Sequence, residues 1–229
     1  MLRWMTAALL LAACAPVALA GTAAGDAALK AAMKSFYVVV PADAATGKPV
    51  AEVRGNADGT GKQTVVVAFI DAADAAAEMK AAGLSTSSEG RLVNGAELVG
   101  LTDGEVIWRT SKSNADIVNT APTVPPVFYI TNAAGESLTQ MINGQEKVLF
   151  YLDAVAADEA RVAIQNGLSA ARKPATLSIV AADFAGLVQG VQAGKVKNAH
   201  FVASPSVVRW ASQWDKGTRL IKDYKPPAD

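Results

Sequence analysis

Cysteine and histidine, the side chains that most often bind metals or act as nucleophile and base, are almost missing from this sequence. There is one cysteine, Cys14, and one histidine, His200. An intrachain disulfide cannot form, and a zinc site of the usual kind has too few ligands. A lone histidine beside an apolar run is typical of a packing residue, because a general base needs a nucleophile and an orienting partner within reach. We therefore expect no metal and no cofactor, and stability that comes from burial.

An excess of one charge is also missing, since 21 Lys and Arg are balanced by 21 Asp and Glu. No long-range field then attracts nucleic acid or an anionic membrane. Beyond the N-terminus, no apolar run approaches the roughly eighteen residues of a transmembrane helix. The composition therefore predicts neither a nucleic-acid partner nor a transmembrane span.

The N-terminus reads "MLRWMTAALLLAACAPVALA" and is typical of an export leader. Arg3 precedes a short apolar run, and Ala18-Leu19-Ala20 forms an A-x-A cleavage signal. We predict a signal peptide at 1–20 and an exported, periplasmic protein. A second interpretation stays open, because Leu11-Ala12-Ala13-Cys14 resembles a bacterial lipobox. Residues 1–13 would then be a lipoprotein signal, and Cys14 would anchor the protein through a lipid.

What the sequence does contain is an internal repeat. The stretches "QTVVVAFIDAADAAAEMKAAGLS" at 63–85 and "KVLFYLDAVAADEARVAIQNGLS" at 147–169 share one order: an apolar run, an aspartate, an alanine-rich acidic stretch and Gly-Leu-Ser. The offset of about 84 residues is too long for a solenoid, whose repeats run about 20–50 residues. We predict a duplicated chain with a first half at 25–120 and a second half at 121–225.

Each copy predicts the same series of elements, because turn residues separate short apolar runs in both. After a helix at 22–35, the first copy predicts strands at 36–40, 50–53 and 65–70 and a helix at 72–82. The second predicts strands at 126–130, 138–142 and 148–152 and a helix that ends before Gly167. A fourth strand is expected at 96–101 and at 175–180. The fold class is α/β (α+β): two pseudo-symmetric halves, each a small mainly antiparallel sheet with packed helices, joined as one compact duplicated domain.

The third strand of each half is apolar at every position. A strand with one solvated face would alternate, so both faces are covered or one face lines an apolar groove. A helix beginning at Ser204-Pro205 would place Trp210 and Trp214 on one face, either docked on the core or at the rim of an apolar site. The candidate groove residues are Phe69, Phe128, Ile130, Phe150, Leu152, Trp210 and Trp214.

Motifs that carry chemistry are not evident. The sequence has no Gly-x-Ser-x-Gly, and "GNADGTGK" lacks the Gly-Lys-Ser/Thr ending of a phosphate loop. Asp71 and Asp153 could form a carboxylate pair, but their place between strand and helix favours helix capping. We therefore do not expect an enzyme.

Several of these stretches resemble the Tic22 family. The matching residues are the run Pro125 to Asn132, the turn Gly135 to Leu138, the strand 148–152 with Asp153, the segment 177–184 and the stretch Phe201 to Ala211. The resemblance covers roughly residues 30–215. It implies two similar halves with apolar pockets between sheet and helices, and a chaperone or carrier in the chloroplast intermembrane space or the bacterial periplasm.

Two functions follow as hypotheses. The first is a periplasmic Tic22-like chaperone or carrier that binds apolar segments of unfolded or extended client proteins during envelope biogenesis or protein translocation. Its partners would be these clients and envelope membrane proteins. The second is a lipid-anchored envelope scaffold without chaperone activity, attached through Cys14.

Overall fold

The computed structural model describes residues 3–5, 23–43, 45–46, 48–55, 62–82, 88–101, 106–111, 114, 125–173, 175–211 and 220–221. The predicted leader apart from Arg3–Met5, the candidate lipid anchor Cys14 and the candidate groove residue Trp214 lie outside these ranges. Among the described residues, no helix has the length and apolar character to cross a bilayer.

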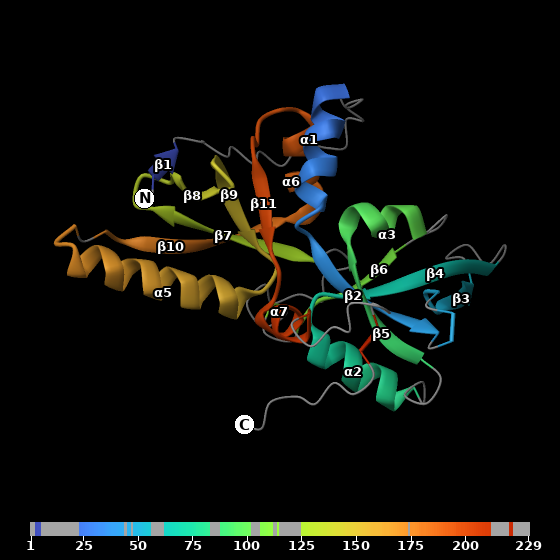
Figure 1. Ribbon diagram of the computed structural model, residues 1–229. Helices are drawn as coiled ribbons and strands as arrows, with labels where there is room; N and C mark the ends of the chain where they lie inside the picture. The colour runs from blue at the N-terminus through green and yellow to red at the C-terminus, as the bar shows by residue number, and fades with distance from the viewer. Residues whose placement is uncertain are drawn as a thin grey trace.

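The chain forms two mixed sheets, each with helices against it (Figure 1). The first sheet has the order β12-β5-β2-β4-β3, with β6 also paired to β4. Its strands are β2 Tyr37–Asp43, β3 Ala51–Gly55, β4 Lys62–Phe69, β5 Ser88–Asn94, β6 Val106–Arg109 and β12 Leu220–Ile221. The helices of this part are α1 Ala23–Met33, α2 Ala72–Ala81 and α3 Gly95–Leu101.

The second sheet has the order β1-β8-β7-β9-β11, with β10 also paired to β7. Its strands are β1 Arg3–Met5, β7 Pro126–Asn132, β8 Ser137–Ile142, β9 Gln145–Tyr151, β10 Leu177–Asp183 and β11 Ala199–Val202. Its helices are α5 Ala154–Ala170, α6 Phe184–Gln192 and α7 Pro205–Ala211.

The two sheets repeat one topology. In each half, three antiparallel strands lead to a helix, a fourth strand pairs with the first, a second helix follows, and a last strand pairs parallel with the third. The hydrogen bonds that join the third strand to the last strand of each half match as well. Ile70 N donates to the Arg109 carbonyl at 3.0 Å, and Leu152 N donates to the Val202 carbonyl at 3.0 Å. The α/β fold with two equivalent halves is therefore as predicted, while the domain limits at 120 and 121 stay a prediction.

Two expected elements are wrong. Residues 96–101 belong to helix α3 and not to a strand, because the Asn94 side chain accepts the Glu97 N–H at 2.9 Å and caps a helix there. Helix α5 does not stop at Gly167 but runs to Ala170. Its last turn is closed by Arg172, which takes the left-handed conformation at φ 56° while Lys173 N bonds the Leu168 carbonyl at 2.8 Å.

Strand β2 also continues through Pro41, where the sequence predicted its end. The Pro41 carbonyl accepts a hydrogen bond from Val50 N at 2.8 Å, on the edge opposite the pairing with Gly90 in β5. Because the N and the C=O of one strand residue face the same edge, the missing N–H of Pro41 removes no bond to β5.

Alternate side chains of the strands enter different cores, which explains the unbroken apolar runs. Val66, Ala68 and Ile70 face a core shared with the second sheet, while Val67 and Phe69 face α2 and α7. In the second half, Phe150 and Leu152 belong to the shared core, while Leu149 and Tyr151 face α5. Each residue of the runs 65–70 and 148–152 is 6 % exposed or less, so both faces of these strands are largely covered.

Aromatic rings fill the shared core between the halves. The Phe36 ring lies 5.5 Å from the Trp108 ring in its own half, and 5.0 and 5.1 Å from the Phe184 and Phe201 rings of the other half. Edge-to-face pairs of this kind contribute about 0.5–1.5 kcal/mol beyond area burial. Helix α1 packs on α6 and β11 and closes this core.

In each half, the segment that follows the last strand packs against the other half. After β11, the Ser204 hydroxyl donates to the Ile70 carbonyl at 2.9 Å, and the Ser206 hydroxyl donates to the Asp71 carboxylate at 2.6 Å. The α7 side chains Val207 and Trp210 then complete the outer core of the first sheet.

The reciprocal segment follows β6. The Ser111 hydroxyl donates to the Asp153 carboxylate at 3.2 Å, and the Asn114 amide donates to the Leu152 carbonyl at 2.8 Å. Both strand-to-helix junctions are thus held by polar groups of the opposite half.

Candidate functional site

The predicted groove residues lie in the cores. Phe69, Phe128, Ile130, Phe150, Leu152 and Trp210 are each 3 % exposed or less. They are divided among three clusters. Phe150 and Leu152 belong to the shared core, and Phe128 and Ile130 lie under α5. Phe69 lies under α2 and α7, in the same cluster as Trp210 of α7. The structure thus gives these six side chains a packing role, and Trp214 lies outside the described residues.

An open concave surface exists nearby, between α5 and the segment from β11 to α7. Its volume is about 690 Å³, and it is shallow and open to solvent. Its α5 wall consists of Ala156, Glu159, Ala160 and Ala163. Its floor consists of Tyr151 and Val202, and its opposite wall of Ala203, Pro205, Val208 and Arg209. We call this surface the α5–α7 groove.

The groove exists because α5 lies off-centre on the second sheet. It packs mainly on β10 and β7, at the side of the sheet away from β11. The outer face of the sheet therefore shows Val202 of β11 between α5 and α7. Small side chains on this flank of α5, Ala156, Ala160 and Ala163, keep the wall low and apolar.

Helix α7 has two apolar faces, one for the core and one for the groove. Val207 and Trp210, three residues apart, are buried against the first sheet. Gly90 permits this close approach, because a Cβ at that position would lie 1.8 Å from the Trp210 ring. Val208 points to the groove and is 57 % exposed, the most exposed of the large apolar side chains in the described part of the chain.

The polar groups of the groove are few. Glu159 and Arg209 stand on opposite walls, and the other eight residues are uncharged. Burial raises the pKa of the Tyr151 hydroxyl above its ordinary 10.0, so the floor stays neutral over the physiological range. The groove can thus accept an apolar surface and offers one charge of each sign at its rim.

His200 and the two junction aspartates do not form a reactive site. Burial, and less strongly the charge of Lys147, lowers the pKa of His200, which lies on β11 as a half-buried packing residue. Asp71 accepts the Ala73 and Asp74 amides at 2.8 and 3.1 Å, so it caps α2 as predicted. Asp153 accepts the Ala156 amide at 2.9 Å and caps α5 in the same way. The two aspartates belong to separate junctions.

Sequence reasoning missed the groove residues because they are mostly alanines and valines. One signal was available: Val207 and Val208 are adjacent on a helix, so about 100° separates them and only one can enter the core. Val155 and Val162 on α5 also point away from the core, since they are 49 % and 41 % exposed.

The two-half fold is one that solved structures share, and its class is the Tic22 fold. Anabaena Tic22 (protein transport) matches with a TM-score of 0.63 and 12 % sequence identity, over 83 % of this chain and 98 % of that chain. Tic22 from Plasmodium falciparum matches with a TM-score of 0.57 and 13 % identity, over 81 % of this chain and 96 % of that chain.

No protein-family model and no curated protein matches the sequence. At identities this low, the likeness to the two Tic22 structures establishes the fold alone. This chain is thus a protein with the Tic22 fold, and the predicted resemblance is confirmed at that level.

Proposed function

We propose that this protein acts in protein transport as an exported, passive carrier. It binds extended apolar segments of client proteins in the α5–α7 groove and keeps them from aggregating. The observation that carries the proposal is the open groove of about 690 Å³ with eight uncharged residues among its ten. The fold adds support, because a matching structure, Anabaena Tic22, is described as a protein of protein transport.

The physical basis is burial of apolar surface. Removing apolar area from water contributes about 25 cal/mol per Å², and the ordering of an extended client offsets part of this gain. A shallow alanine and valine surface therefore gives weak, reversible binding with little dependence on client sequence. This is the behaviour that a carrier needs, because it must release its clients. The leader predicted from the sequence supports a carrier in the periplasm, either free or attached through Cys14.

The test measures aggregation of guanidine-denatured rhodanese after dilution into buffer with the purified protein. We expect a several-fold molar excess to slow the rise in light scattering. Val208→Asp places a charge on the groove wall without touching the core, so the variant should lose most of this effect. The matched control is Met141→Asp on β8, where the side chain is 47 % exposed and lies outside the groove.

Two results would contradict the proposal. One is an absence of any effect of the wild-type protein at several-fold excess. The other is equal activity of Val208→Asp and Met141→Asp, which would show that exposed apolar surface in general, and not the groove, holds the client.

A further inference from the structure

The two edges of strand β10 differ in their pairing among the described residues. On its inner edge, all seven residues from Leu177 to Asp183 pair antiparallel with β7. On its outer edge, no strand in the described part of the chain pairs with it. An unpaired edge presents a row of free backbone N–H and C=O groups, which is a template for a further strand.

The sequence of β10 lacks lysine, proline and a bulge, which are common protections of such an edge. Natural edge strands carry lysine, proline or a bulge, or they are very short. β10 reads "LSIVAAD", its register with β7 is continuous, and its one charged residue, Asp183, caps α6 by accepting the Gly186 amide. Ser178 and Ala181 are exposed on it, and Ile179 and Val180 are half-buried. This edge is therefore long, apolar and accessible.

The equivalent edge of the first half is occupied. In the first half, Val39 of β2 pairs with Phe69 of β4 and with Leu92 of β5. In the second half, Phe128 of β7 pairs in the same way with Tyr151 of β9 and with Ala181 of β10. Strands β5 and β10 are therefore equivalent. The extended segment β12 pairs antiparallel with β5, opposite Gly90 and Arg91. The positions of β10 that correspond to these two residues are Ile179 and Val180. Strand β12 is thus an example, within this protein, of an extended segment that pairs at the position equivalent to the outer edge of β10.

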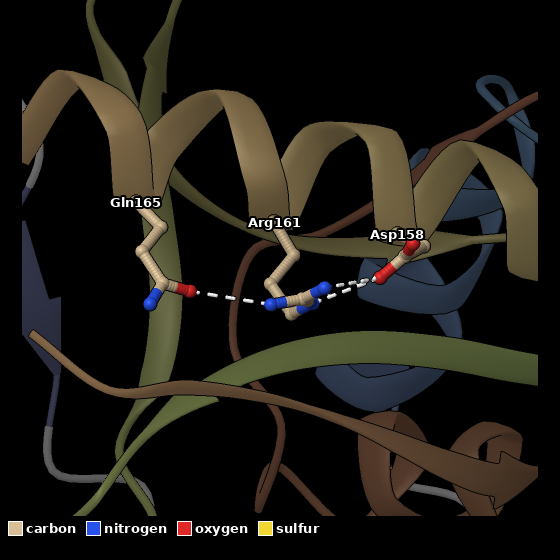
Figure 2. A network of polar contacts seen from close by, with 3 residues as sticks. All are labelled: Asp158, Arg161 and Gln165. Carbon is tan, nitrogen blue, oxygen red and sulfur yellow. Dashed lines mark hydrogen bonds and ion pairs between the residues drawn. The ribbon is translucent and has the colours of Figure 1, made fainter.

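A polar row borders the β10 edge on α5. Arg161 donates to Asp158 at 2.9 and 2.7 Å and to Gln165 at 3.2 Å, and the three side chains lie along one side of the helix (Figure 2). At 3.6 residues per turn, this side is opposite the flank that carries Ala156, Glu159 and Ala163 in the groove. The groove flank of α5 faces β11, and β10 lies on the other side of β7 and β9 from β11. The polar row, on the opposite flank of α5, therefore faces β10. The edge and the groove are therefore separate surfaces.

We propose that the outer edge of β10 is a strand-addition site for an extended apolar segment of a client polypeptide. The segment pairs antiparallel across Ile179 and Val180, as β12 pairs with β5. Backbone hydrogen bonds supply the affinity, so the site tolerates many sequences, and the alternation of a strand sets which side chains face α5. The inference deepens the proposed carrier function, on which it rests for the identity of the occupant, and it gives the carrier a second point of contact.

The probe is a fluorescein-labelled synthetic peptide with the chain's own sequence "TRLIKDY", residues 218–224, titrated into the full-length protein. Hydrogen exchange followed by mass spectrometry should show slower exchange of the 177–183 amides when the peptide is bound. Ala181→Lys adds the edge charge that natural sheets use against pairing, and it should weaken binding by about tenfold or more. Val162→Lys, an equal charge on the exposed side of α5, should leave binding unchanged.

Other outcomes overturn the inference. They are the absence of binding, protection confined to 88–94 or to 202–209, and equal binding by Ala181→Lys and Val162→Lys. Protection of 177–183 that rises with protein concentration without peptide, together with a dimer in sedimentation, would show that a second copy takes the edge. The two proposals can fail separately: peptide protection of β10 with no effect of Val208→Asp on rhodanese would refute the groove, and the reverse pattern would refute the edge.

Discussion

The Ser206 hydroxyl donates a hydrogen bond of 2.6 Å to the Asp71 carboxylate, across a sequence separation of 135 residues. The same hydroxyl accepts the Ala72 amide at 3.0 Å. A serine of α7 in the second half therefore completes the start of α2 in the first half. Through this contact the stability of either half depends on the other.

Ser206→Ala should lower the free energy of unfolding by about 2 kcal/mol, because it removes a hydrogen bond to a carboxylate and leaves the Ala72 amide unsatisfied. Urea denaturation followed by circular dichroism measures this change. Ser178→Ala, on the exposed part of β10, is the control and should change stability by less than about 0.5 kcal/mol. The change for Ser206→Ala should appear as one transition for both halves, and two separate transitions would contradict the coupling.

Gly25→Ala tests the packing of α1 on α6. A Cβ at position 25 would lie 1.9 Å from the backbone carbonyl oxygen of Gln192, and a backbone atom cannot turn aside as a side chain can. We expect a loss of about 1–3 kcal/mol, the usual cost of overpacking. Thermal denaturation of the two variants Gly25→Ala and Gly167→Ala provides the comparison.

Gly167 is the matched site because it also lies in a helix, and a Cβ added there would meet nothing within 4 Å. Gly167→Ala should raise stability by about 0.5–1 kcal/mol, since alanine loses less backbone entropy in a helix. Equal effects of the two alanines would show that α1 does not make this contact.

Arg172→Gly should stabilise the protein. Arg172 holds φ at 56° to close α5, a conformation that costs a residue with a Cβ about 1 kcal/mol and costs glycine little. The variant should therefore gain up to about 1 kcal/mol in urea denaturation. Ser169→Gly, three residues earlier inside the helix, should lose a similar amount, and a loss at both positions would contradict the assigned end of α5.

His200 should make the stability depend on pH in the weakly acidic range. Burial and the charge of Lys147 lower its pKa from the ordinary 6.5, so the unfolded chain binds a proton at a higher pH than the folded chain does. The contribution is thus fully present above pH 6.5, and it falls as the pH decreases toward the folded pKa. Chemical denaturation between pH 7.5 and 5 measures it.

The variant His200→Gln isolates this effect, because the sequence contains no other histidine. Its stability should fall less steeply over this range than that of the wild type. Lys147→Gln should give an intermediate slope, since it removes the smaller cause and leaves the burial. Identical slopes for the wild type and His200→Gln would contradict the assignment.

Local chemistry made much of the fold predictable. Asp71 and Asp153 followed apolar runs and cap helices, and Asn143-Gly144, a common hairpin dipeptide, forms the turn between β8 and β9 with φ of 51° and 76°. The unbroken apolar runs of the third strands left open whether both faces are covered or one face lines a groove, and the structure buries nearly all of their side chains. The fourth strand of the first half was misplaced, because the apolar pattern at 96–101 was assigned to a strand although Asn94 caps a helix there.

The groove could not be predicted in the same way, because it depends on where whole elements lie. Phe128 and Phe150 are large and apolar, but nothing local shows that α5 and the other half would cover them. Val208 and Ala160 lie at the surface because α5 packs toward β10 and because α7 packs against the first sheet. Residue type predicts burial on average, whereas concavity is a property of tertiary placement.

The crossing of the last segments sets an order of events for a chain that emerges with its N-terminus first. The outer core of the first sheet needs Val207 and Trp210, which are made more than a hundred residues after Phe69. Until residue 211 has been synthesised, α2 has no α7 to pack on, and the outer core of the first sheet lacks Val207 and Trp210. The first half therefore reaches its final packing only after the second half has been made.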